Sequence, residues 1–171
     1  FDRNDVMLWM EVANQIYGGN TLMVIHGISM GGATTMMIAG EPQPEYVKCF
    51  VDDCGYTSVW SQFGKELKEQ FGMSEFPLLY TSSWLCGILN GWTFQEASSL
   101  KQVKKSHLPM LFIHGEKDTY VPTSMVYELY DAKPEPKELW VVPEADHAKS
   151  YLLNREEYTE KVRQFTDKYM Q

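Results

Sequence analysis

The 171-residue sequence lacks an excess of basic residues: 15 Lys and Arg stand against 23 Asp and Glu, for a formal net charge of −8. Proteins that bind nucleic acid usually concentrate Lys and Arg on one face, so this charge argues against a nucleic-acid partner. The sequence also has no apolar run of roughly 18 residues, the length that a membrane-spanning helix requires. Its first residues do not resemble a signal peptide.

Cysteine is scarce as well, and Cys49, Cys54 and Cys86 form an odd-numbered set without the spacing of a zinc site. The sequence therefore indicates neither a disulfide framework nor a metal site, and no motif in it indicates a cofactor. Hydrophobic residues make up 44% of the chain and aromatic residues 13%, so a single domain over residues 1–171 can bury a sizeable core.

Short apolar runs alternate with segments of helical periodicity along most of the chain. Continuous apolar runs of this length are typical of strands that are covered on both faces, as in a parallel sheet. They predict strands over residues 21–25, 47–51, 110–113 and 139–142. Helical spacing predicts helices over residues 3–17, 31–39, 123–130 and 156–169. This alternation predicts an α/β fold of three layers, α/β/α, with a mostly parallel sheet.

The alternation breaks between residues 58 and 100, where no strand pattern occurs. This segment is instead dense in aromatic and apolar residues, among them Trp60, Phe63, Phe71, Trp84 and Trp92. One interpretation is a helical insertion that forms a cap or lid over the sheet. The other is a set of ordinary helices that cover the sheet, and the sequence leaves both open.

The pentapeptide Gly-Ile-Ser-Met-Gly at residues 27–31 fits the pattern G-x-S-x-G and lies between a predicted strand and a predicted helix. A serine on such a sharp turn needs small neighbours and has its hydroxyl lifted clear of the sheet edge. We therefore predict Ser29 as a nucleophile and the N–H of Met30 as a donor to an oxyanion. The alternative is a glycine-rich turn without a catalytic role.

A serine hydroxyl is a poor nucleophile at neutral pH, so a histidine has to take its proton. We predict His147 as this base, because it follows the last strand on a polar loop that reaches the carboxyl edge of the sheet. The other three histidines fit worse. His26 precedes the turn and would point away from Ser29, His114 ends a strand as a structural hydrogen-bonding group, and His107 lies in a solvated loop.

A carboxylate has to fix the tautomer of the base, and we predict Asp118 for this role. It lies on the loop after the third predicted strand, just before the next helix. Alternatively, Asp118 caps a helix or stabilises a turn. The other candidates for the acid are Glu116, Asp146 and the pair Asp52 and Asp53. The order serine, aspartate, histidine along the chain is the one expected of α/β-hydrolases.

Four stretches of the chain together resemble bacterial α/β-hydrolases related to serine aminopeptidases and to the catalytic domains of prolyl oligopeptidases. They are IHGISMGGAT over 25–34, DDCGYTS over 52–58, FIHGEKD over 112–118 and ADHAKSY over 145–151. The resemblance implies a cytosolic or cell-surface bacterial hydrolase of small-molecule or peptide esters or amides. It places the nucleophile, acid and base on Ser29, Asp118 and His147.

The resemblance also places the four predicted strands at the fifth to eighth positions of an eight-stranded sheet. The first four strands, and the His-Gly loop that supplies a second oxyanion donor, would then be missing from this sequence. We therefore expect a C-terminal fragment of a longer hydrolase that is weakly active or inactive alone. Its first strand would be an exposed edge, open to self-association or to pairing with an N-terminal segment.

Two further readings of the function stay open. The same three residues serve acyltransferases, which pass the acyl group to an acceptor other than water. A non-catalytic binding or assembly module of a longer hydrolase would instead use the exposed strand edge to dock a partner.

Overall fold

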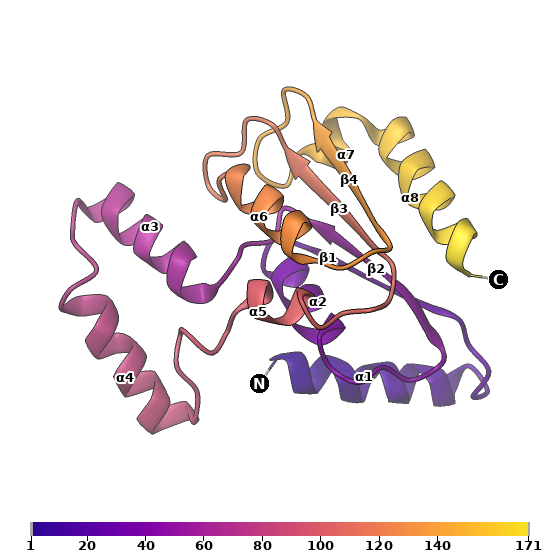
Figure 1. Ribbon diagram of the computed structural model, residues 1–171, viewed down its shortest axis with the longest axis horizontal. Helices are drawn as coiled ribbons and strands as arrows, with labels where there is room; N and C mark the ends of the chain where they lie inside the picture. The colour runs from indigo at the N-terminus through magenta and orange to yellow at the C-terminus, as the bar shows by residue number, and fades with distance from the viewer. Residues whose placement is uncertain (1, 171) are drawn as a thin grey trace.

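The computed structural model describes residues 2–170 and contains a four-stranded parallel sheet (Figure 1). The strands are β1 (Met23–Ile28), β2 (Val47–Asp53), β3 (Met110–Gly115) and β4 (Lys137–Val142), and their order in the sheet is β1-β2-β3-β4. Every neighbouring pair is parallel. The predicted parallel α/β fold is confirmed, and each strand lies beside the strand that precedes it in the chain.

Helices cover both faces of this sheet. On one face lie α1 (Asp2–Ile16), α2 (Met30–Ala39), α5 (Ser99–Val103) and α6 (Ser124–Ala132), and their buried side chains share a core with Phe50 and Phe112. On the other face α8 (Arg155–Tyr169) packs Tyr158 and Phe165 against Val51 and its neighbours. Alternate residues of β2 and β3 therefore enter two separate cores, which explains the unbroken apolar runs over residues 49–51 and 110–113.

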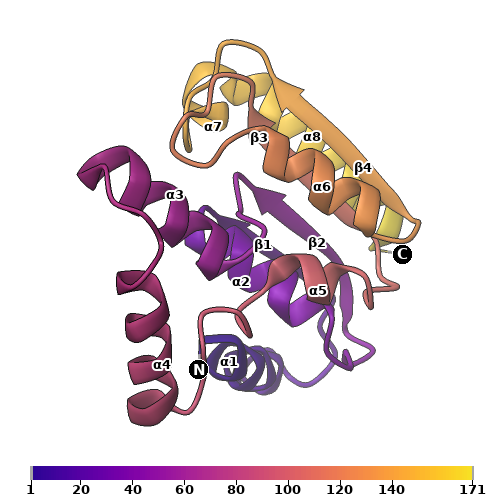
Figure 2. The same ribbon diagram turned by 60° about the vertical axis from the view of Figure 1, so that its left-hand side comes forward.

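The segment between residues 58 and 100 forms two helices, α3 (Val59–Phe71) and α4 (Leu78–Asn90), and a third, α5, begins at its end. The short helix α5 lies on α2, where the Ser99 hydroxyl donates to the carbonyl of Ala33 at 3.3 Å. In contrast, α3 and α4 form a hairpin that projects away from the sheet (Figures 1 and 2). The helices that make up most of the segment thus project from the sheet, and only its last residues, at the start of α5, pack on α2. A lid function for the hairpin stays a prediction.

Most predicted elements lie within two or three residues of the observed ones. The largest difference is in the first strand, which runs to Ile28 rather than ending at residue 25. Backbone pairing of His26 and Gly27 with β2 extends it, and this pairing does not depend on apolar side chains. The short helix α7 (Ser150–Leu153) was not predicted. Within residues 2–170, no helix combines the length and the apolar character needed to cross a membrane.

Candidate active site

The turn between β1 and α2 holds Ser29 in a strained backbone conformation. Its φ of 56° and ψ of −114° are rare for a residue with a side chain, and its N–H donates to the Asp53 carbonyl at 2.8 Å. A Cβ atom on Gly27 would lie 2.0 Å from the carbonyl oxygen of Gly31, so only glycine fits before the turn. Backbone strain and close approach together present the serine side chain at the carboxyl edge of the sheet.

The expectation of close packing is wrong for the second glycine of the pattern. A Cβ atom on Gly31 would meet nothing within 4 Å, because this position faces open space. The close approach occurs instead at Gly32, where a Cβ atom would lie 2.2 Å from Oδ1 of Asp52. The steric requirement is therefore shifted by one residue along α2.

His147 connects the serine to the predicted acid. Its Nε2 lies 2.8 Å from Oγ of Ser29, and its Nδ1 lies 2.7 Å from Oδ2 of Asp118. Three side chains from three different loops thus form one hydrogen-bonded chain, spanning 118 residues of sequence between Ser29 and His147. This arrangement can deprotonate a serine hydroxyl and hold the resulting imidazolium beside a carboxylate.

Asp118 is buried and held from several sides. Its Oδ1 accepts the backbone N–H of Val121 at 2.8 Å, while Oδ2 also lies 3.3 Å from Nε2 of His114. Burial by itself would raise the pKa of Asp118, but the contacts with His114, His147 and Val121 outweigh it and lower the pKa to about 2. The carboxylate is therefore ionised at neutral pH, as an acid that steadies an imidazolium has to be.

The loops after β3 and β4, which carry Asp118 and His147, are joined through their backbones. The N–H of Glu116 donates to the Val142 carbonyl at 2.9 Å, and that of Lys117 donates to the Ala145 carbonyl at 2.8 Å. A Cβ atom on Gly115 would lie 2.4 Å from the same Ala145 oxygen. These contacts fix the separation of the two loops, and with it the distance between the acid and the base.

Comparison with known proteins places this chain in a family. The sequence profile of the prolyl oligopeptidase family matches residues 2–171. The chain belongs to the prolyl oligopeptidase family. It is 32% identical to the uncharacterised protein YqkD of Bacillus subtilis over 167 residues, which are 98% of this chain and 55% of YqkD.

Solved structures of α/β-hydrolases share the fold. The Pyrococcus furiosus esterase Pf2001 matches 98% of this chain with a TM-score of 0.72 and 21% identity, over 62% of its own length. The Pyrococcus horikoshii acylaminoacyl peptidase matches 99% of this chain with a TM-score of 0.67 and 18% identity, over 28% of its length. This member of the prolyl oligopeptidase family therefore spans only part of the proteins that it matches.

Met30 lies where the predicted oxyanion donor should be. It is the first residue of α2, and the first N–H groups of a helix have no acceptor within the helix. The positive end of the helix dipole also favours negative charge at this point. The position thus suits the predicted role, which stays a prediction.

The rivals of the predicted acid and base lie elsewhere in this family member. His26 bonds to the Tyr158 hydroxyl at 2.9 Å on the α8 side, and His107 is exposed. Glu116 accepts the N–H of Glu144, and Asp146 accepts the backbone N–H of His147 rather than binding its ring. Asp53 accepts hydrogen bonds from Tyr158 and Ser150 on the α8 face, and Asp52 accepts the N–H of Gly55.

Three residues that contact or adjoin the triad were not predicted to lie there. The ring of Tyr120 packs against His147 with centroids 4.9 Å apart, His114 contacts Asp118 besides bonding to Val121, and Cys54 lies beneath the site. An aromatic residue two positions after the acid is a weak sequence signal. No signal in the sequence marks Cys54.

Cys54, Asp118 and His147 place potential metal ligand atoms within 4.8 Å of one another. However, Asp118 and His147 already bond to each other, and burial raises the pKa of the Cys54 thiol. A thiol that keeps its proton is a poor ligand, so the group does not favour a cation.

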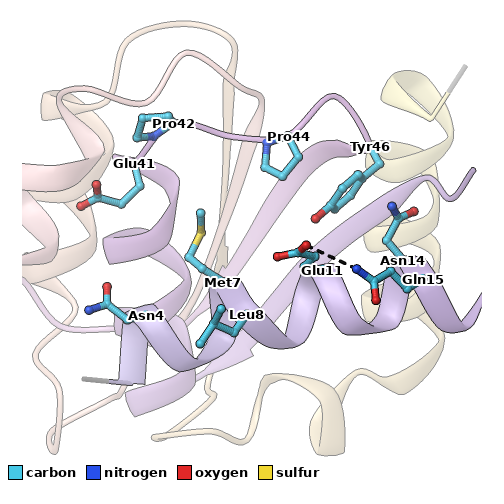
Figure 3. Close-up of a pocket in the computed structure, with 10 residues that line it drawn as sticks. All are labelled: Asn4, Met7, Leu8, Glu11, Asn14, Gln15, Glu41, Pro42, Pro44 and Tyr46. Atoms are coloured by element: carbon cyan, nitrogen blue, oxygen red, sulfur yellow. Dashed lines mark hydrogen bonds between the residues drawn. The ribbon is translucent and has the colours of Figure 1, made fainter. Parts of the chain in front are cut away.

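A hollow between α1 and the loop before β2 is shown in Figure 3. Residues such as Leu8, Pro42 and Tyr46 line it, and Gln15 donates to Glu11 beside it at 3.3 Å. Tyr46 immediately precedes β2, so this hollow lies at the amino end of the strands. The triad lies at the opposite, carboxyl end, where ligands of open α/β sheets bind.

Proposed function

We propose that this chain carries the catalytic residues of a serine hydrolase that cleaves ester or amide bonds through an acyl-enzyme. The observation that carries the proposal is the hydrogen-bonded chain from Ser29 through His147 to Asp118, at 2.8 and 2.7 Å. Membership of the prolyl oligopeptidase family supports the hydrolase class.

In the proposed reaction, Nε2 of His147 takes the proton of the Ser29 hydroxyl while Oγ forms a bond to the carbonyl carbon of the substrate. The carbonyl oxygen becomes an oxyanion, to which the N–H of Met30 donates. The imidazolium, steadied by Asp118, then gives its proton to the leaving alcohol or amine as the bond to it breaks. A water molecule repeats both steps on the acyl-enzyme and restores the serine.

The substrate is proposed to be a small-molecule or peptide ester or amide with an apolar group beside the carbonyl. Tyr120 and Met30 both expose large apolar side chains next to the triad. The carbonyl of Tyr120 also accepts a hydrogen bond from Gln62 of α3 at 2.9 Å, so the base of the hairpin adjoins this surface. An apolar substrate group could cover these side chains and displace water from them.

The chain spans about half the length of the curated relative YqkD. The resemblance to α/β-hydrolases implies a second donor to the oxyanion on a His-Gly loop that residues 1–171 do not contain. Loss of one such donor typically costs about 10²–10³ in kcat. An impaired or non-catalytic assembly role is therefore the second candidate. It rests on β1, which in residues 2–170 pairs on one side only and is half exposed. A second copy or an N-terminal segment would add a strand there.

A fluorophosphonate probe tests the enzyme directly, because it modifies a serine only when the base activates it. We expect covalent labelling of this chain, none in Ser29→Ala, and strong slowing in Asp118→Asn. Glu116→Gln is the matched control and should label normally, since an amide keeps the acceptor for Glu144. A folded chain that stays unlabelled would sink the catalytic proposal. Light scattering after gel filtration tests the β1 edge, which predicts an oligomer rather than a monomer.

A panel of nitrophenyl esters of increasing acyl length, beside aminoacyl amides, then ranks the substrates. We expect longer or aromatic acyl groups to react faster than acetate. Replacement of Tyr120 by Ser should remove that preference and leave acetate hydrolysis less affected. Equal loss for all acyl groups would contradict the apolar substrate surface.

A further inference from the structure

A buried carboxylate at the end of β2 connects the serine turn to the loop that carries the base. Asp53 is the last residue of β2 and is 1% exposed. Its backbone carbonyl accepts the N–H of Ser29 at 2.8 Å. Its side chain lies on the α8 face of the sheet, as does that of Val51 two residues earlier. Asp53 therefore contacts Ser29 through its backbone and can bind other elements through its carboxylate.

One oxygen of this carboxylate holds the segment that follows His147. Oδ1 of Asp53 accepts the hydroxyl of Ser150 at 3.4 Å. Ser150 is the first residue of α7, three residues after His147, and is 1% exposed. Between them, Ala148 has a positive φ of 55°, which is rare for a residue with a side chain. Such a conformation persists only where surrounding contacts hold it, and the bond from Ser150 to Asp53 is one of these contacts.

Tyr158 of α8 holds the other oxygen. Its hydroxyl donates to Oδ2 of Asp53 at 2.9 Å, and Nε2 of His26 lies 2.9 Å from the same hydroxyl. A hydroxyl has one proton to donate, so Nε2 of His26 is the donor to the tyrosine oxygen. Burial and the Asp53 carboxylate both raise the pKa of Tyr158, so its hydroxyl keeps the proton. The proton of Tyr158 therefore points to Asp53.

Both oxygens of Asp53 thus accept a hydrogen bond, as those of an ionised carboxylate can. Burial raises the pKa of Asp53, and the bonds from Tyr158 and Ser150 are among the contacts that oppose this effect. Rotation of the carboxylate would break at least one of the two bonds. Its orientation is therefore fixed from α8, and it in turn fixes the start of α7.

We propose that Asp53 positions the base relative to the nucleophile. The backbone bonds between the loops after β3 and β4 fix His147 relative to Asp118. Asp53 adds the link to Ser29, because its carbonyl contacts the serine turn while its carboxylate anchors Ser150. Nε2 of His147 has to stay within hydrogen-bonding distance of Oγ of Ser29, here 2.8 Å, so a small shift of the loop would weaken proton transfer. Asp53 is thus a positioning residue, and its effect on catalysis rests on the proposed function.

The contacts form a series, from Tyr158 through Asp53 to Ser150, and two variants test this order. Ser150→Ala removes the last link and should slow fluorophosphonate labelling by about tenfold, as loss of a hydrogen bond to a charged group does. Tyr158→Phe should slow it by about threefold, since the carboxylate keeps the Ser150 donor. The double variant should label within about twofold of Ser150→Ala, because Tyr158 acts only through the link already lost. Effects that multiply would overturn the proposal, since each residue would then support the fold separately.

The loss should appear in the labelling rate at saturating probe and not in the probe concentration that gives half of that rate. Asp53, Ser150 and Tyr158 act through His147 and do not bind the probe. Tyr151→Phe is the control for Tyr158→Phe, because its ring contacts that of Tyr158 edge to face at 5.5 Å. Ser106→Ala is the control for Ser150→Ala, because it also removes a buried hydroxyl but precedes β3 at the amino end of the strand. Equal slowing in a control and its partner would contradict the proposal.

Asp53→Asn tests the carboxylate itself. The amide offers one acceptor oxygen to two donors, so we expect labelling to slow by about tenfold or more, as misplaced catalytic groups do. Normal labelling by folded Asp53→Asn would overturn the proposal. If circular dichroism shows that this variant does not fold, the Ser150 and Tyr158 variants decide.

The position of the base is also tested without any reaction, by ¹⁵N NMR of the histidine-labelled chain. His147→Gln assigns the resonances of the base. We expect Ser150→Ala to shift these resonances and the double variant with Tyr158→Phe to shift them equally, whereas those of the exposed His107 stay unchanged. Unchanged His147 resonances in Ser150→Ala would overturn the proposal, whatever the labelling. If the unmodified chain does not label at all, the proposed function fails, and this measurement still decides whether Asp53 positions the base.

Discussion

The carboxyl edge of the sheet and the α3–α4 hairpin differ in how far their side chains are buried. At the edge, Asp118 accepts hydrogen bonds at both carboxylate oxygens and is 5% exposed. In the hairpin, Phe71, Phe76 and Trp84 are between 67 and 71% exposed. A helix whose large apolar side chains face outward contributes little to the core that positions the triad.

This difference separates the loops that hold the triad from the hairpin that lies beside them. The triad rests on three loops whose backbones are joined to each other and to β2. The hairpin meets this edge mainly through α3, where Gln62 donates to the Tyr120 carbonyl. Catalysis should therefore be sensitive to the loss of a few atoms at the edge. It should tolerate the loss of whole side chains in the hairpin.

The strongest way to break the comparison is to remove one side chain of the triad at the edge. Ser29→Ala or His147→Ala should lower the rate of ester hydrolysis by about 10⁴-fold or more, because neither partner acts without the other. Trp84→Ala in the hairpin should keep most of the rate. Initial rates with a nitrophenyl ester measure both. A hairpin variant as impaired as Ser29→Ala would refute the division between the regions.

The same contrast applies to stability. Phe112 is fully buried in the core beneath the edge, so Phe112→Ala should cost about 3–5 kcal/mol of unfolding free energy. Phe71→Ala should change it by less than about 0.5 kcal/mol, because its side chain is mostly exposed already. Urea denaturation followed by circular dichroism measures the two values. Similar costs would mean that the hairpin folds back onto the core in solution.

The two glycines of the serine turn allow a packed position and an open one to be compared within one motif. Gly27→Ala forces a methyl group onto the backbone of Gly31 and should cost about 1–3 kcal/mol, as overpacked sites do. Gly31→Ala enters open space on a helix and should stabilise the chain by up to about 1 kcal/mol. Thermal unfolding of both variants checks the sign. Equal destabilisation would contradict the packing described for Gly31.

Much of the edge could be predicted from the sequence because its signals are local. Apolar runs identified the strands, and strands of a parallel sheet bring their carboxyl ends together, so residues following them had to lie near Ser29. The loops after β3 and β4 do hold Asp118 and His147 within hydrogen-bonding reach. The roles of these residues stay predictions until a reaction is measured.

Other features could not be predicted, because long-range packing decides them. The contact between His114 and Asp118 depends on the path of the loop, which turns Asp118 back toward the strand it follows. The direction of the hairpin is equally invisible in its composition, since aromatic residues suit a lid and a covering helix alike. Cys54 lies beneath the site and has a positive φ of 51° directly after β2, which no sequence pattern indicates.

The last test concerns Asp52, whose raised pKa should make the stability of the edge depend on pH where that of the hairpin does not. Unfolded Asp52 loses its proton above about pH 4, whereas burial in the fold raises its pKa to about 8. A raised carboxyl pKa means that the folded state binds the proton more tightly, so this contribution to stability declines as pH rises between those values.

Asp52→Asn cannot titrate, and contributions common to both proteins cancel in their difference. Its unfolding free energy minus that of the unmodified chain should therefore rise by about 1 kcal/mol per pH unit between about pH 4 and 8. Phe71→Ala in the hairpin changes no ionisable group and an exposed side chain, so it should give a nearly flat difference. Urea titrations at four pH values measure both slopes. Parallel curves for Asp52→Asn would mean that Asp52 is ionised in the fold.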